Sequence, residues 1–190
     1  MKLLTRLIIS TILLSFFSQA IVMRHDVSPD KYQVKQSQYE SVVDLNFLTG
    51  TLIDPLWVLT AAHANSYMPG KQEITINQQK YTVEFIIQHP EYNRDNLSHD
   101  ITLLKLDRPV TNIVSTGIYT LADEKSQHVW FVGRGDVGNG QVGITDATTT
   151  LNHAENIIES AENLWITFDF DSPKNNALAL LITYLTVASE

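Results

Sequence analysis

The chain has 190 residues, which is enough for one or two domains with a buried core. Its 44% hydrophobic and 18% charged residues exclude a disordered or collagen-like protein, and its net charge of −8 argues against binding to nucleic acid or anionic membranes. It contains no cysteine, which excludes disulfides, cysteine-ligated zinc, iron–sulfur clusters and a thiol nucleophile.

Residues 1–20 have the composition of a secretory signal peptide. Lys2 and Arg6 supply positive charge, and the apolar run over residues 7–17 is too short to span a bilayer as a helix. Ser18 and Ala20 are small residues at the −3 and −1 positions of a cleavage site. We therefore predict a mature N-terminus at Ile21, no activation peptide, a secreted or periplasmic location, and no membrane partner once the signal is removed.

From residue 32 onward, short β-branched and aromatic runs alternate with turn residues, and no segment keeps a helical period over three turns. This pattern predicts an all-β fold, an antiparallel sandwich or barrel, with only residues 60–65 resembling a helical turn. The two halves are expected to meet near residues 110–115. The predicted strands are 41–47, 51–53, 57–59, 73–77, 81–88, 101–106, 117–121, 128–132, 141–149 and 164–170.

Two segments of the first half stand out as carriers of chemistry. In Leu59-Thr60-Ala61-Ala62-His63, a turn of small residues follows a strand and presents a histidine. In Asp100-Ile101-Thr102-Leu103-Leu104-Lys105-Leu106, an aspartate directly precedes a buried strand. A lone histidine is usually structural, and a lone aspartate at a strand start usually forms a turn. The functional interpretation of these two residues therefore depends on the residues that flank them.

The remaining candidate ligands do not form a known metal pattern. His89, His99, Asp95 and Asp100 have no spacing typical of zinc, such as two histidines four residues apart on a helix. We interpret the histidines as solvated loop residues and predict no metal site.

Residues 133–138 match the glycine pattern of dinucleotide-binding loops, and they contain the cell-adhesion tripeptide Arg134-Gly135-Asp136. A dinucleotide site needs a helix directly after the loop, whereas a second loop and a strand follow here. We interpret the stretch as a turn and predict no cofactor.

The histidine and aspartate segments together resemble the trypsin/chymotrypsin-like serine proteases. His89-Pro90-Glu91-Tyr92 is similar to the segment that leads to the aspartate in many members, and Ile21-Val22 is similar to their mature N-terminus. The resemblance covers residues 21–135. It implies a trypsin-like double antiparallel β-barrel that hydrolyses peptide bonds in protein or peptide substrates through an acyl-enzyme.

The resemblance also implies roles for two side chains. His63 would be the general base that takes the proton of a serine hydroxyl, and Asp100 would fix the ring tautomer and stabilise the imidazolium. Ala64 follows the histidine where the family commonly has a cysteine. The bridge made by that cysteine is absent, but catalysis does not chemically require it.

The family's nucleophile motif, Gly-Asp-Ser-Gly-Gly, does not occur in the 190 residues, so the resemblance yields no nucleophile. Ser172 is the only serine after residue 116 that an aspartate precedes, but Pro173 lacks the N–H that an oxyanion-hole turn needs. Ser189 has no glycine near it. We expect a truncated or frameshifted protease that is inactive as this chain. The alternative is a non-catalytic secreted all-β binding protein or a protease relic.

The expected organisation is a complete first barrel over residues 21–110 and an incomplete second barrel over residues 111–176. Residues 177–190 form an apolar tail that differs from the substrate-pocket loops expected there and is too short for a membrane span. A buried final strand is the alternative for this tail.

Overall fold

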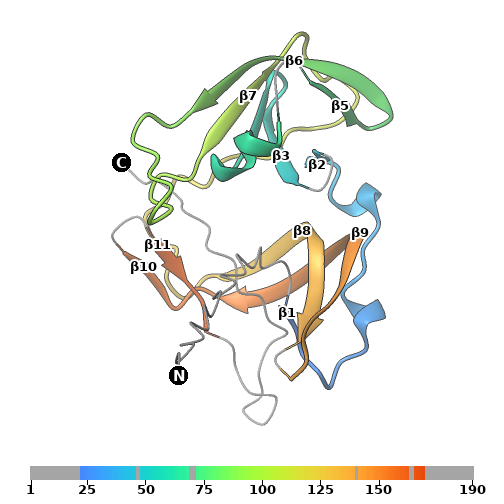
Figure 1. Cartoon of the computed structure of the whole chain (residues 1–190), viewed down its shortest axis with the longest axis vertical. Helices are drawn as coiled ribbons and strands as arrows, with labels where there is room; N and C mark the ends of the chain where they lie inside the picture. Colours follow the sequence, from blue (N-terminus) through green and yellow to red (C-terminus); the bar gives the residue numbers. More distant parts are fainter. Residues whose placement is uncertain (1–21, 46–47, 69–71, 140, 163–164, 170–190) are drawn as a thin grey trace, which may run out of the picture.

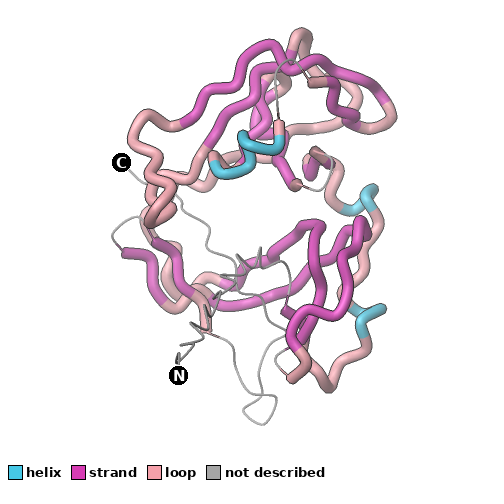
Figure 2. Tube along the Cα trace, in the orientation of Figure 1, coloured by secondary structure: helices cyan, strands magenta, loops and turns pink. Residues whose placement is uncertain are grey.

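The computed structural model describes residues 22–45, 48–68, 72–139, 141–162 and 165–169. Within these ranges the regular elements are strands, apart from three short 3₁₀ turns, η1 (Pro29–Lys31), η2 (Gln36–Gln38) and η3 (His63–Tyr67) (Figures 1 and 2). Several sequence predictions fall outside the described residues. They are the signal peptide (residues 1–20), the mature N-terminus at Ile21, the serines Ser172 and Ser189, and the apolar tail (residues 177–190).

Six antiparallel strands of the first half close into a barrel in the order β2-β3-β4-β7-β6-β5. Because successive side chains of a strand point to opposite faces, the alternation of buried and partly exposed residues along β7 fills the barrel with Thr102, Leu104 and Leu106. The strands are β2 (Val42–Asp44), β3 (Thr49–Asp54), β4 (Trp57–Thr60), β5 (Glu73–Ile76), β6 (Gln79–Gln88) and β7 (Thr102–Leu106).

The barrel core is one cluster of buried side chains drawn from these strands and the segments that join them. Apolar burial of this kind is the main favourable term in folding. The cluster consists of Val43, Leu45, Leu52, Val58, Ala64, Met68, Ile74, Ile76, Tyr81, Val83, Leu104, Leu106 and Val110.

The second half forms an open sheet below the barrel in Figure 1. The long strands β8 (His128–Asn139) and β9 (Gly143–Ile157) pair antiparallel, and β1 (Val22–Met23) joins β8 in parallel. Two short strands, β10 (Ser160–Glu162) and β11 (Trp165–Thr167), pair with each other. Among the described residues, a closed barrel with a partial second sheet confirms the predicted all-β, trypsin-like fold class. The incomplete second barrel over residues 111–176 stays a prediction.

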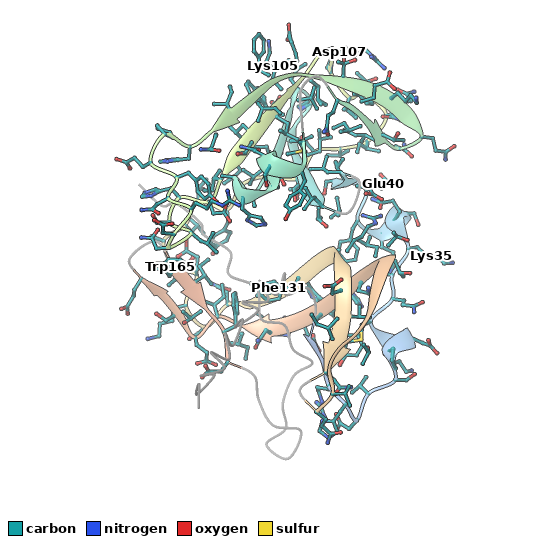
Figure 3. The ribbon with its side chains drawn as sticks, viewed as in Figure 1. Lys35, Glu40, Lys105, Asp107, Phe131 and Trp165 are labelled. Carbon is teal, nitrogen blue, oxygen red and sulfur yellow. The ribbon has the colours of Figure 1, made fainter. Side chains whose placement is uncertain are left out.

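A smaller core lies against the second sheet. It contains Met23, Tyr32 and Ala154, with Phe131 packed against it. Figure 3 labels Phe131 on β8, and its ring meets that of Phe168 edge-on at a centroid distance of 4.6 Å. The residues before the barrel thus pack on the second half, while the closed barrel itself spans β2 to β7. The domain boundary near residue 110 stays a prediction.

The strand predictions of the second half differ in detail from the structure. Residues 117–121 form no strand, and three of their apolar side chains are exposed. The strand predicted over residues 141–149 continues to Ile157.

The stretch 133–138, interpreted as a turn, lies inside β8, where the pairing with β9 shifts register twice. Glycines at such irregularities let the ladder continue through a bulge, which composition alone does not separate from a turn. Arg134 of this stretch donates hydrogen bonds to the carbonyl of Thr149 and the side chain of Gln36.

Candidate active site

His63 and Asp100 are brought together by two neighbouring strands of the barrel. β4 ends at Thr60, three residues before His63, and β7 begins at Thr102, two residues after Asp100. Thr60 and Thr102 are direct partners in the β4–β7 ladder. Side chains 37 residues apart in sequence therefore meet at one end of this strand pair.

Small side chains allow the turn that carries His63 to sit close to the barrel. Ala62 and Ala64, on either side of the histidine, are both buried, and Ala64 belongs to the barrel core. The hydroxyl of Thr60 donates to the carbonyl of Thr49 at 3.0 Å and ties the end of β4 to β3. The 3₁₀ turn that starts at His63 is the helical turn predicted over residues 60–65, displaced toward the C-terminus.

The carboxylate of Asp100 holds His63 at two points. Its Oδ2 lies 2.6 Å from Nδ1 of the imidazole, and its Oδ1 accepts the backbone N–H of His63 at 2.8 Å. The Asp100 side chain is 6% exposed, whereas that of His63 is 48% exposed. A buried anion thus orients a ring that solvent still reaches, and the Nε2 atom takes no part in this contact.

The contact shifts the pKa of both groups toward the charged forms. The hydrogen bond to Asp100 raises the pKa of His63 above its ordinary value, although partial burial opposes the shift. Burial raises the pKa of Asp100, but the hydrogen bonds from the side chain and backbone of His63 outweigh it, so this pKa lies below its usual value.

Asn65 and Thr102 help to hold the turn that carries His63, although the sequence motifs assign them no role. The amide of Asn65 donates to the hydroxyl of Thr102 and to the side chain of Gln88, each at 3.0 Å. Ser66 donates from its hydroxyl to the carbonyl of His63 at 2.9 Å. The two Asn65 bonds connect η3 to β6 and β7, and the Ser66 bond lies within η3. A single Asn or Thr gives no sequence pattern from which such a role could be predicted.

The other candidate ligands separate into two groups. The rings of His89 and His99 stack at a centroid distance of 4.7 Å, and Glu91, which the sequence analysis did not consider as a ligand, joins them. Asp100 faces His63, and Asp95 is not a member of the group around the two stacked rings.

A family model described as Trypsin matches residues 26–164. A trypsin from Simulium vittatum is 32% identical over 106 residues, covering 52% of this chain and 43% of the relative. Human trypsin-3 is 32% identical over 102 residues, covering 48% of this chain and 33% of the relative. Human kallikrein-4 is 38% identical over 73 residues, covering 34% of this chain and 29% of the relative. The chain thus spans less than half the length of these relatives.

Solved structures share the fold. The structure of neuropsin, a serine protease from mouse brain, superposes with a TM-score of 0.61 at 22% identity and covers 80% of each chain. The resemblance noted in the sequence is confirmed by the family model, which covers more than half of the chain. The protein is a member of the trypsin family of serine proteases.

Proposed function

We propose that the protein has the scaffold of a serine-type endopeptidase, in which His63 is the general base and Asp100 is the anion that positions it. The observation that carries this proposal is the double contact of the Asp100 carboxylate with the ring and the backbone of His63. Protein or peptide chains are the substrate class.

The chemistry follows from which ring nitrogen the aspartate uses. A neutral imidazole carries one N–H and one lone pair, and a carboxylate at Nδ1 favours the proton there. The lone pair is then on Nε2, which can accept a proton from a hydroxyl that attacks a peptide carbonyl. Asp100 stabilises the imidazolium that results, and the same ring can return the proton to the leaving amine.

A polypeptide of these 190 residues does not, in our proposal, hydrolyse peptides by itself. It contains no Gly-Asp-Ser-Gly-Gly, the motif that supplies the nucleophile and the oxyanion-hole amides in the family. Loss of one member of such a triad lowers the rate by about 10⁴-fold or more. The absent motif also favours the second candidate function, a non-catalytic binding protein built on the same scaffold.

Secretion is part of the proposal. Residues 1–20 act as a signal peptide, and cleavage before Ile21 releases the remaining chain outside the cytoplasm. Within the described residues, the model contains no helix with the length and apolar character needed to cross a membrane. N-terminal sequencing of exported protein tests the cleavage site, and a first residue well beyond Val22 would contradict it.

The catalytic part is tested on the purified chain with a panel of peptide substrates and a covalent probe for reactive serines. We expect no turnover and no labelling, with His63→Ala and Asp100→Asn indistinguishable from the parent. Labelling of a serine in the parent that is lost in His63→Ala would refute the proposed inactivity.

The role of the pair is tested separately by ¹⁵N NMR of the histidine rings. We expect His63 to carry its proton on Nδ1 when neutral. A neutral ring with its proton on Nε2 would refute the proposed base function, whatever the activity assays show.

A further inference from the structure

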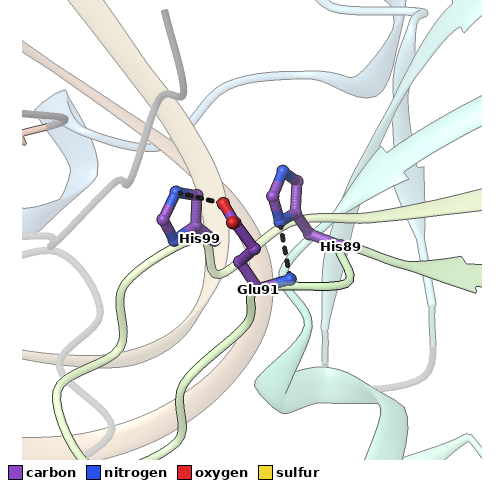
Figure 4. Close-up of side chains that lie close together, drawn as sticks. All are labelled: His89, Glu91 and His99. Atoms are coloured by element: carbon purple, nitrogen blue, oxygen red, sulfur yellow. Dashed lines mark hydrogen bonds and ion pairs between the residues drawn. The ribbon is translucent and has the colours of Figure 1, made fainter.

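A second group of titratable side chains lies in the loop between β6 and β7, apart from the contact of His63 with Asp100. His89 directly follows β6, His99 comes three residues before β7 begins at Thr102, and Glu91 lies beside both (Figure 4). Their ligand atoms all lie within 4.8 Å of one another. Nδ1 or Nε2 of each histidine and a carboxylate oxygen are therefore available at one place.

The loop backbone holds these three side chains in position. The N–H of His89 donates to the carbonyl of Ile101 at 2.9 Å, and the N–H of Asn93 donates to the carbonyl of Ser98 at 3.0 Å. His99 has a φ of 53°, in the left-handed region that costs a residue other than glycine about 1–2 kcal/mol. The two rings are stacked with only 17° between their planes.

The existing contacts leave the polar atoms of the group incompletely bonded. Nε2 of His99 lies 3.5 Å from Oε2 of Glu91, which is too long for a strong hydrogen bond. Nδ1 of His99 is buried and has no hydrogen-bond partner among the described residues. A buried polar atom of this kind calls for a missing partner, such as a water. The nitrogen of His99 that faces Glu91, and is therefore placed to share an ion with it, is Nε2.

The spacing suits a metal ion. Two ligand atoms of a tetrahedral ion with bonds of about 2.0–2.1 Å lie about 3.3–3.4 Å apart. This is close to the 3.5 Å between Nε2 of His99 and Oε2 of Glu91. Two imidazoles with one carboxylate form a set that Zn²⁺ binds while keeping one position open, whereas Ca²⁺ and Mg²⁺ prefer oxygen ligands. We propose that His89, Glu91 and His99 form a Zn²⁺-binding site on the loop that precedes Asp100.

Binding requires a change at His89. Its Nδ1 accepts the backbone N–H of Glu91 at 3.1 Å, so a neutral ring carries its proton on Nε2. The metal either takes the Nδ1 lone pair and displaces this N–H, or binds Nε2 after the proton moves to Nδ1. Both routes are open because the N–H is solvent-exposed and water can replace the lost bond.

The test is a Zn²⁺ titration of the full chain, produced without a polyhistidine tag and freed of metal with EDTA. We expect one Zn²⁺ per chain, and a weakening of at least about 10–100-fold in Glu91→Gln and in His99→Gln. His128→Gln is the matched control, because His128 also faces a carboxylate, that of Glu155 at 3.1 Å, but lies on the second sheet. Its affinity should equal that of the parent.

Ring NMR of the unmodified chain provides a readout that does not depend on how a variant folds. Added Zn²⁺ should shift the ring signals of His89 and His99 and leave those of His128 in place. The absence of Zn²⁺ binding, an equal affinity in Glu91→Gln and the parent, or shifts confined to other histidines would overturn the proposal.

Discussion

Asp100→Asn removes the charge that faces His63 and preserves the shape of the side chain. The remaining amide oxygen can still accept the backbone N–H of His63, so the loss falls on the contact with the ring. A hydrogen bond to a charged group contributes about 1.5–3 kcal/mol, but the half-exposed ring reduces this toward the smaller value of solvent-screened pairs. We expect the free energy of unfolding to fall by about 1–2 kcal/mol.

The pH dependence of this loss has a definite sign. The hydrogen bond with Asp100 raises the pKa of His63 above 6.5, so its contribution is complete below pH 6.5 and is lost as the pH rises through the raised value. Burial raises the pKa of Asp100, but the hydrogen bonds from His63 outweigh it and bring the pKa below 3.8. That contribution is complete above pH 3.8 and is lost as the pH falls through the lowered value. The difference between parent and variant is greatest between pH 3.8 and 6.5.

Urea unfolding in EDTA, measured inside this window and again at alkaline pH, is the assay. Glu155→Gln is the matched control, because it removes the carboxylate that faces the partly exposed His128, and such pairs contribute about 0–1 kcal/mol. Equal urea midpoints for the parent and Asp100→Asn inside the window would refute the reasoning. A difference that does not shrink at alkaline pH would do the same.

Two further predictions concern the packing of the barrel, each measured by urea unfolding. Leu104→Ala empties a fully buried position and should cost about 2–5 kcal/mol, whereas Val114→Ala at an exposed position should change stability by less than about 0.5 kcal/mol. Gly50→Ala places a Cβ 2.7 Å from Cγ1 of Val58 and should cost about 1–3 kcal/mol, while Gly117→Ala, with open space around it, should be close to neutral. Equal midpoints within either pair of variants would show that the packing reasoning is wrong.

The first half of the fold could be predicted from the sequence because its signals are local. Alternating residues such as those of β5 and β7 bury one face of a strand, and this period of two is visible without a structure. The contact of His63 with Asp100 could be predicted for a different reason, because both residues lie in segments typical of one family. Asn65 and Thr102 were missed because a single polar residue carries no pattern.

The second half was harder because its contacts depend on distant partners. Residues 117–121 have strand-like composition, yet no strand in the described part of the chain pairs with them. The group of His89, Glu91 and His99 was missed because irregular loop geometry, and not a regular spacing, brings the three side chains together. Sequence spacing predicts ligands on one helix or strand, but it does not predict which atoms meet across a loop.

The closed barrel is built from one uninterrupted stretch of chain, and this affects the order in which the molecule acquires its structure. All its strands lie between Val42 and Leu106, so they can assemble during synthesis before β8 has left the ribosome. The parallel pairing of Val22 with Gly138 must wait, because it closes a much longer loop. We therefore expect the contact of His63 with Asp100 to form early in folding. Strand β1, although it is synthesised first, should pair with β8 last.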